Sequence, residues 1–300
     1  MTQLPLEKYF SLINLDKVFT SSPMIKTSKE QVVDELLHQL LQEPNDPKDV
    51  KIPPNYVNKR SLLRGLLNKR EPKSLDSEFL WKMDALLQTE LKDKGVVEVN
   101  KLDTVSRLFP NNPFTQSDKF ILWKGDITQL NANAIVNAAN KYMLGCFQPS
   151  HACIDNAIHS AAGPQLRNDC EVIMTQQGEL EDTGNAKITR AYNLPSKYVL
   201  HTVGPIVPNG TDLTKLQKKK LASCYISCLE LTHAIDDIKT IAFCAISTGV
   251  FGFPKTEAAK IAVNTVNDWL ESQQNHFDKV IFNVFSEEDY NEYLKVFQQR

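Results

Sequence analysis

Apolar residues recur at helical spacing in the first third of the chain. A helix is predicted from Ser28, in the segment SKEQVVDELLHQLLQE, because its apolar positions repeat every three to four residues. Proline and asparagine interrupt this pattern at 44–55, and helical spacing returns at 61–68 and 76–95. We expect Trp81 and the leucines around it to lie in the helix core. The other positions that these helices are expected to bury are Val32, Leu36, Leu40, Leu66, Leu80 and Leu87.

The pattern changes after a turn-rich stretch at 102–118, where short apolar runs begin to alternate with helical segments. Such alternation favours an α/β domain whose mixed or parallel sheet is covered by helices on both faces. We therefore expect a helical N-terminal extension at 1–113 and an α/β domain at 114–300. The strands are predicted at 120–124, 134–137, 186–192, 198–204, 240–246 and 279–285, and the helices at 153–163, 215–233, 257–273 and 286–297, the last with Ser286 as its N-cap.

Charge and composition narrow the classes of partner. The chain has 42% hydrophobic and 23% charged residues, so it can bury an ordinary core. Its net charge is −2, whereas a protein that binds nucleic acid would usually be basic, so we expect no nucleic acid partner. We also expect no membrane partner and a cytoplasmic location, because no apolar run could span a bilayer and the start MTQLPLEKYF does not resemble a signal peptide.

Two of the loops that follow predicted strands have the composition of binding loops. In KGDIT, Asp126 could accept hydrogen bonds from an exocyclic amine, or it could simply form a turn or a helix cap. In ISTGVFGFP, Gly249 and Gly252 would let backbone N–H groups approach a diphosphate, beside the small side chains of Ser247 and Thr248. The second loop matches neither the P-loop nor the dinucleotide fingerprint, and it could also be an ordinary strand-to-helix connection.

A third loop contains a possible metal site. The chain has six cysteines, all between Cys146 and Cys244, and in a cytoplasmic chain of this length they indicate thiols or metal ligands rather than disulfides. Cys146, His151 and Cys153 are spaced C-x4-H-x-C. Two thiolates and one imidazole suit zinc and leave its fourth position open, as a catalytic site requires. The alternative is two buried cysteines and a surface histidine.

The remaining cysteines and histidines have simpler interpretations. Cys224 and Cys228 lie four residues apart on a predicted helix, which is typical of core packing. His159 and His201 fall in a predicted helix and a predicted strand, and we expect them to be structural histidines with satisfied hydrogen bonds.

Taken together and in order, six motifs resemble the macrodomain family of the MacroD type: KGDIT, AIVNAAN, AIHSAAG, TGNAKIT, LPSKYVLHTVGP and AISTGVFGFP. The resemblance covers the chain from Phe120 onward. It implies a three-layer α/β/α sandwich around a six-stranded mixed sheet, with ADP-ribose as the ligand. The insertion GCFQPSHACIDN, together with the helical N-terminal extension, resembles the zinc-dependent branch of that family.

The resemblance also implies roles for individual residues of this chain. Asp126 and Ile127 would contact adenine, and Asn137 and Asn140 would lie near the distal ribose. Asp155 aligns with the family's catalytic aspartate, with Asn140 as the second catalytic candidate. The residues implied around the diphosphate and the distal ribose are Ser247, Thr248, Gly249, Val250, Phe251 and Gly252, and the implied zinc ligands are Cys146, His151 and Cys153.

The function that follows is the hydrolysis of the bond between a protein side chain and C1″ of the distal ribose, with an ADP-ribosylated protein as substrate and free ADP-ribose as product. Zinc could activate a water molecule or orient a ribose hydroxyl, and Asp155 could activate water or hold a ribose hydroxyl. Two alternatives stay open: a reader module that binds ADP-ribose without cleaving it, and a hydrolase of small ADP-ribose derivatives. A zinc-dependent nucleobase deaminase is a remoter alternative, because its H-x-E and P-C-x-x-C signature is missing.

Overall fold

The fold is built around a six-stranded mixed sheet, as predicted. In this computed structural model, residues 4–25, 27–43, 50–208, 211–273 and 277–298 are described. The strand order is β2-β8-β7-β4-β6-β5, and all neighbours are parallel except β5, which runs antiparallel to β6. The strands are β2 Phe120–Lys124, β4 Ala134–Ala139, β5 Ala186–Arg190, β6 Tyr198–Val203, β7 Thr240–Phe243 and β8 Lys279–Val284.

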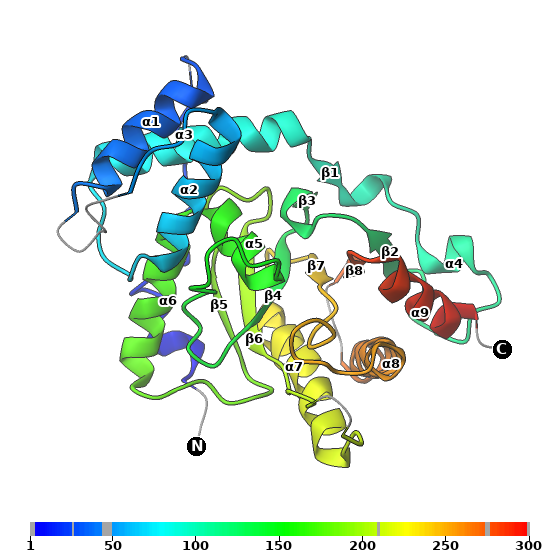
Figure 1. The fold of residues 1–300 in the computed structure, drawn as a ribbon. Helices are drawn as coiled ribbons and strands as arrows, with labels where there is room; N and C mark the ends of the chain where they lie inside the picture. Colours follow the sequence, from blue (N-terminus) through cyan, green and yellow to red (C-terminus); the bar gives the residue numbers. More distant parts are fainter. Residues whose placement is uncertain (1–3, 26, 44–49, 209–210, 274–276, 299–300) are drawn as a thin grey trace.

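The strand sequences are nearly continuous apolar runs because both faces of the sheet are covered by helices. Helices α5 and α6 pack against each other and contact β4 and β5, and the neighbouring helices α7, α8 and α9 form another layer (Figure 1). The three-layer α/β/α arrangement is therefore confirmed. These helices are α5 Ile154–Ala162, α6 Pro164–Gln177, α7 Lys215–His233, α8 Lys255–Ser272 and α9 Glu287–Gln298.

Most predicted boundaries hold to within a few residues, and the differences have local causes. The strand predicted at 240–246 ends at Phe243, because the chain then turns into the loop that follows β7. Helix α6 was not predicted, since it buries Arg167 and Asp169 and so lacks a clean apolar stripe. Ser286 caps α9 as predicted, because its hydroxyl accepts a hydrogen bond from the N–H of Asp289 at 3.1 Å.

The N-terminal extension contains three helices that share a core of their own: α1 Lys29–Leu40, α2 Tyr56–Lys69 and α3 Ser77–Lys94. Ser28 caps α1 as predicted, and residues 44–49 of the predicted interruption lie outside the described residues. Of the positions expected to be buried, Leu66 and Leu80 are only partly so. The prediction for Trp81 was wrong: its side chain is 50% exposed, because α3 buries the face that carries Phe79 and Met83 instead.

The first residues of the chain pack into the large α/β core rather than into the extension. Tyr9, Ile13 and Leu15 are buried there, after the short 3-10 helix η1 Leu6–Lys8. The Tyr9 hydroxyl accepts a hydrogen bond from the N–H of Ile188 in the edge strand β5, at 3.2 Å. Edge strands otherwise leave such groups unpaired, so this contact protects the edge of the sheet.

Short elements that the sequence pattern did not predict lie between α3 and β2 and again between β2 and β4. The first set is β1 Val97–Glu98, the 3-10 helix η2 Val99–Lys101 and the helix α4 Val105–Leu108, and the second is the 3-10 helix η3 Ile127–Gln129 and β3 Leu130–Asn131, which pairs in parallel with β1. Within the described ranges, none of the helices combines the length and the apolar character that a membrane crossing needs.

Candidate active site

The loops at the carboxyl ends of four parallel strands surround a cavity of about 540 Å³. In sheets of this kind, ligands bind at that edge. The structure brings most of the residues singled out from the sequence to the wall of this one cavity. They are Asp126, Ile127, Asn140, Cys146, His151, Cys153, Asp155, Ser247, Thr248, Gly249, Val250 and Phe251. Asn137 and Gly252 are not among the lining residues, and Asn137 is buried behind Asp155.

The strand order fixes the order of these groups along the cavity. The loop after β2 carries Asp126 at one end, and β8 and β7 follow, with the β7 loop at 244–254. The loop after β4 carries Asn140 and the Cys/His group, so these residues lie at the end opposite Asp126. The cavity therefore extends across four strands and carries different functional groups at its two ends.

Asp126 performs a structural task and keeps a free oxygen. Its Oδ1 accepts hydrogen bonds from the N–H of Thr128 at 3.0 Å and from the Thr128 hydroxyl at 2.7 Å, which caps the 3-10 helix η3. Its second carboxylate oxygen has no hydrogen bond to the described residues, so it remains available to a donor in the cavity. The helix-cap interpretation is confirmed for Oδ1, and the binding interpretation, which would use the other oxygen, stays a prediction.

The loop after β7 has the form of an anion-binding nest. Gly252 turns the chain with a positive φ of 68°, and its N–H bonds the carbonyl of Gly249 at 3.0 Å. Across the described residues, the three consecutive N–H groups of Gly249, Val250 and Phe251 have no hydrogen-bond acceptor. Unpaired N–H groups in a turn attract anions, so this loop suits a diphosphate.

Asp155 points to the cavity from the first turn of α5. The N-cap of that helix is Cys153, whose sulfur accepts from the N–H of Asn156 at 3.4 Å, so Asp155 is not the helix cap. The amide of Asn137 donates to Asp155 Oδ1 at 2.8 Å, and the amide of Asn140 donates to Oδ2 at 3.4 Å. Burial raises the pKa of Asp155 to about 6. At neutral pH the side chain is therefore a carboxylate oriented by two amide groups, and its pKa lies close enough to neutral pH for it to accept a proton.

His159 lies behind Asp155, with Nε2 3.5 Å from Asp155 Oδ1. Burial lowers the pKa of His159 well below its usual value, so the ring is neutral and the contact is not an ion pair. Neither ring nitrogen has a hydrogen bond with the described residues, so the prediction of a satisfied histidine was wrong for His159. It is confirmed for His201, which contacts the Asn137 amide at 3.1 Å and the Thr189 hydroxyl at 3.0 Å.

The ligand atoms of Cys146, His151 and Cys153 lie within 4.8 Å of one another, and all three side chains are partly exposed. The sulfur of Cys146 is 3.5 Å from Nδ1 of His151. Two ligands of a tetrahedral zinc ion lie about 3.5–3.8 Å apart, given the usual Zn–N and Zn–S distances. Burial raises the pKa of Cys153 to about 11, so a metal would have to displace its proton. The donor set and its spacing fit zinc.

A second group in the described chain could also hold a metal ion: His159, Cys170 and His201, all buried. It lies beneath the cavity floor, beside Asp155. Both nitrogens of His201 already have partners in Asn137 and Thr189, and a metal would have to displace one of them. The Cys146 group differs in that its three side chains are partly exposed and line the cavity. Cys224 and Cys228 are buried in α7, which confirms the prediction of core packing.

The cavity wall also contains residues from segments that the sequence pattern did not single out, namely Arg64, Asn283, Phe285 and Asp289. Phe285 directly follows β8 and is 81% exposed, which places an aromatic face beside Asp126 at that end of the cavity. An aromatic residue at the carboxyl end of a buried strand was the available signal. Arg64 comes from α2 of the extension, and no local pattern indicates that it reaches the cavity.

The comparisons with known proteins agree with this geometry. The Macro domain family model matches residues 136–262. A protein-ADP-ribose hydrolase of Treponema medium is 47% identical over 87% of this chain and 96% of its own length, and one of Staphylococcus aureus strain MRSA252 is 42% identical over 92% and 98%. A solved macrodomain of Oceanobacillus iheyensis, a variant with ADPR, is 41% identical over 59% of this chain and 90% of its own, with a TM-score of 0.53.

Proposed function

The chain belongs to the macro domain family of protein-ADP-ribose hydrolases, and from this premise we propose that it removes mono-ADP-ribose from modified protein side chains in the cavity described above. One observation carries the proposal. The anion-binding loop, the carboxyl group of Asp155 and a zinc-type ligand set all line the same cavity. A module that only binds its ligand needs the first of these and not the other two.

In this proposal the ligand lies along the cavity from the β2 loop to the β4 loop. The free oxygen of Asp126 accepts a hydrogen bond from the adenine amine, with Ile127 and Phe285 providing apolar surface. The N–H groups at 249–251 bind the diphosphate. The distal ribose then reaches Asn140 and Asp155. These remote contacts fix C1″ beside the catalytic groups, which removes much of the entropic cost of the reaction.

The reaction is a hydrolysis. Water adds to C1″, the bond from C1″ to the protein side chain breaks, and the proton of the water ends on the released side chain. Asp155 can take that proton from the water, or it can hold a ribose hydroxyl so that C1″ is exposed to attack. Asn137 and Asn140 orient its two oxygens by their amide hydrogen bonds, so Asn137 acts as a positioning residue from behind the wall.

Cys146, His151 and Cys153 would hold the zinc, which when bound supplies an open coordination position that can lower the pKa of a water molecule or orient a ribose hydroxyl. The loop that carries these three metal ligands, residues 140–153, is called the ligand loop below. Its Pro149 packs beside Gly65 of α2, so the extension supports this loop. A site with two thiolates requires reduced cysteines, and this supports a reducing compartment such as the cytoplasm. The protein partner is an ADP-ribosylated substrate.

Metal analysis combined with a single-turnover assay tests the proposal. The purified protein should carry about one zinc per chain and should release ADP-ribose from a mono-ADP-ribosylated protein. Cys153→Ala should lower both zinc content and release. Cys228→Ala is the matched control, because that thiol is buried in α7 away from the cavity, and it should leave the zinc content unchanged.

The assay also separates the alternatives. Protein that binds ADP-ribose but releases none from several kinds of modified side chain is a reader module. Preferential turnover of small ADP-ribose derivatives would identify the protein as a hydrolase of such small molecules, acting in the same cavity. Absence of zinc from protein prepared without chelators would contradict the metal site while leaving the hydrolase class intact.

A further inference from the structure

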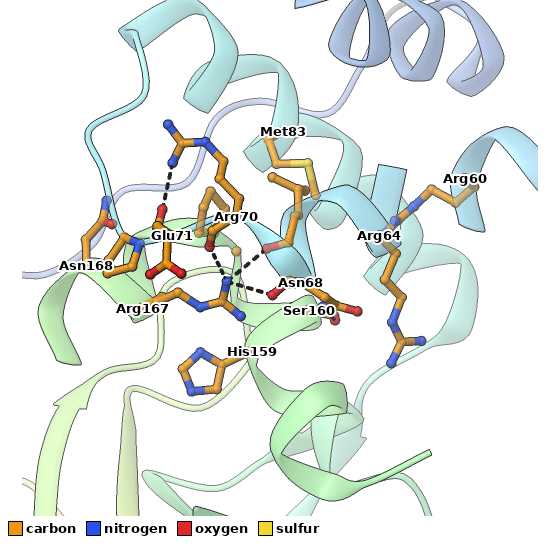
Figure 2. A pocket seen from close by; sticks show the side chains of 14 residues that line it. Arg60, Arg64, Asn68, Arg70, Glu71, Met83, His159, Ser160, Arg167 and Asn168 are labelled. Carbon is orange, nitrogen blue, oxygen red and sulfur yellow. Dashed lines mark hydrogen bonds between the residues drawn. The ribbon is translucent and has the colours of Figure 1, made fainter. Parts of the chain in front are cut away.

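Arg64 is a residue of the N-terminal extension that reaches the cavity of the α/β domain. It lies on α2, and its side chain extends from that helix toward α5 (Figure 2). Its Nε and Nη2 groups donate to Oδ1 of Asn156 at 3.1 and 2.6 Å. Among the described residues of the extension, it is the one that lines this cavity.

The partner of Arg64 is itself fixed. Asn156 is fully buried, and its Nδ2 donates to Asn68 Oδ1 and to the carbonyl of Gln148, both at 3.0 Å. The remaining polar atom, Oδ1, faces Arg64 and also accepts a hydrogen bond from the Ser160 hydroxyl at 3.2 Å. The guanidinium is therefore held at a defined place by two hydrogen bonds, which leaves Nη1 without an acceptor among the described residues.

Arg64 has no carboxylate partner in the described parts of the chain. The Asn156 amide is neutral, and no carboxylate in those ranges forms an ion pair with Arg64. Other arginines of the extension are paired, Arg60 with Glu90 at 2.7 Å and Arg70 with Glu43 at 3.0 Å. A partly buried guanidinium without a counter-ion favours an anion from outside, and its planar fork matches a carboxylate.

The position of Arg64 identifies which part of the substrate it meets. Its partner Asn156 lies in the first turn of α5, next to Asp155 and three residues after Cys153. This is the β4 end of the cavity, opposite Asp126, and the diphosphate loop lies between them in the strand order. The start of α5 adds the positive end of a helix dipole. In the proposed function, this end receives C1″ and therefore the modified protein.

We propose that Arg64 binds a carboxylate of the modified protein, next to the ADP-ribosylated residue, so that the helical extension recognises the protein part of the substrate. The proposal rests on the proposed function, because that function places the protein at this end of the cavity. Arg64 is here a specificity residue rather than a catalytic one, since the group that it would bind belongs to the protein part of the substrate.

The test uses two peptides that carry ADP-ribose on the same residue and differ only in Glu or Gln at the flanking positions. Wild-type enzyme should show about 10- to 100-fold higher kcat/KM for the Glu peptide, and the preference should shrink as the salt concentration rises. Arg64→Gln should abolish the preference and leave the affinity for free ADP-ribose unchanged. Arg60→Gln, one turn earlier and paired with Glu90, is the matched control and should keep the preference.

Binding of the same two peptides to the Asp155→Asn variant separates this proposal from the proposed function. If wild-type enzyme cleaves neither peptide, the hydrolase assignment fails, and the two dissociation constants still test Arg64. Equal kcat/KM and equal binding of the two peptides would overturn the role of Arg64. So would weaker binding of free ADP-ribose to Arg64→Gln, because Arg64 would then contact the nucleotide. Arg64→Lys should retain part of the preference, since it keeps the charge without the fork.

Discussion

Asp155→Asn separates the chemistry of the cavity from its architecture. Asparagine has the shape of aspartate but cannot take a proton from water at neutral pH. If Asp155 activates water or holds the ribose through its charge, single-turnover release of ADP-ribose should fall by roughly 10²–10⁴-fold. That loss corresponds to about 2.7–5.4 kcal/mol of activation free energy.

The structure predicts that the same change costs little stability. The helix cap is Cys153, so no cap is lost. The carboxylate accepts from Asn137 at 2.8 Å and from Asn140 at 3.4 Å, and asparagine keeps one acceptor oxygen, so one hydrogen bond of about 0.5–1.5 kcal/mol is lost. Removal of a buried charge offsets this loss, because burial raises the pKa of Asp155 to about 6 and so disfavours the charged form. The net change in unfolding free energy should be within about 1 kcal/mol.

The assay is single-turnover release from a modified protein, run beside zinc analysis and calorimetry with ADP-ribose on the same preparation. Asp169→Asn is the matched control: burial raises the pKa of that carboxyl to about 6 as well, but it lies on α6 and does not line the cavity. Zinc content and ADP-ribose affinity should change little in either variant. Near-normal release by Asp155→Asn would refute its role and leave the metal as the catalytic candidate.

Three further outcomes follow from named contacts. Gly249→Glu should fold normally, because a Cβ there meets open space, yet calorimetry should show ADP-ribose affinity reduced on the order of 100-fold, since a carboxylate would face the diphosphate; unchanged affinity would place the diphosphate elsewhere. Tyr9→Ala should lower the unfolding free energy by about 3–5 kcal/mol in urea denaturation, because a buried ring and the partner of the Ile188 N–H are lost; a change below about 1 kcal/mol would contradict this packing. Burial raises the pKa of Asp169 in the folded state, so the contribution of this carboxyl to stability should decrease as the pH rises from about 4 to about 6. The unfolding free energy of Asp169→Asn relative to wild type should therefore increase by up to about 3 kcal/mol over that range, and parallel pH profiles would show that the buried carboxyl carries no such penalty.

Local pattern was enough to predict the sheet, most of its helices and the extension. Apolar runs such as 120–124 and helical stripes such as 215–233 coincide with β2 and α7. Helix α6 escaped because its buried face carries Arg167 and Asp169, whose partners come from distant parts of the chain. The burial of Tyr9 escaped for the same reason, since its partner Ile188 lies 179 residues away.

The candidate site could also be predicted only where it depends on local sequence pattern. Residues that directly follow strands, such as Asp126 and the β7 loop, could be singled out because strand ends meet at one edge of a sheet. The sequence could not show which of these residues line the cavity and which support it, because Asn137 points behind Asp155 rather than into the cavity. It also could not place Arg64 at the cavity, since the contact between α2 and α5 depends on how the extension docks.

That docking explains how the ligand loop keeps its shape. Gly145 is its one glycine with positive φ, at 80°, and a Cβ there would lie 2.9 Å from the His159 ring. Arg167 of α6 contacts the loop before and after that glycine: its guanidinium donates to the Leu144 carbonyl at 2.8 Å and lies 4.4 Å from the centre of the Phe147 ring.

The same guanidinium donates to three carbonyls at the end of α2, from Leu67, Asn68 and Arg70 (Figure 2). Asn68 in turn accepts from the N–H of Ser150, inside the loop. One buried cation therefore caps the extension and anchors the loop that carries Cys146 and His151, and each part supplies acceptors for the other's donors. The extension and the ligand loop thus form one structural unit, and a loop of this composition would lose its buried partners if the helices were removed.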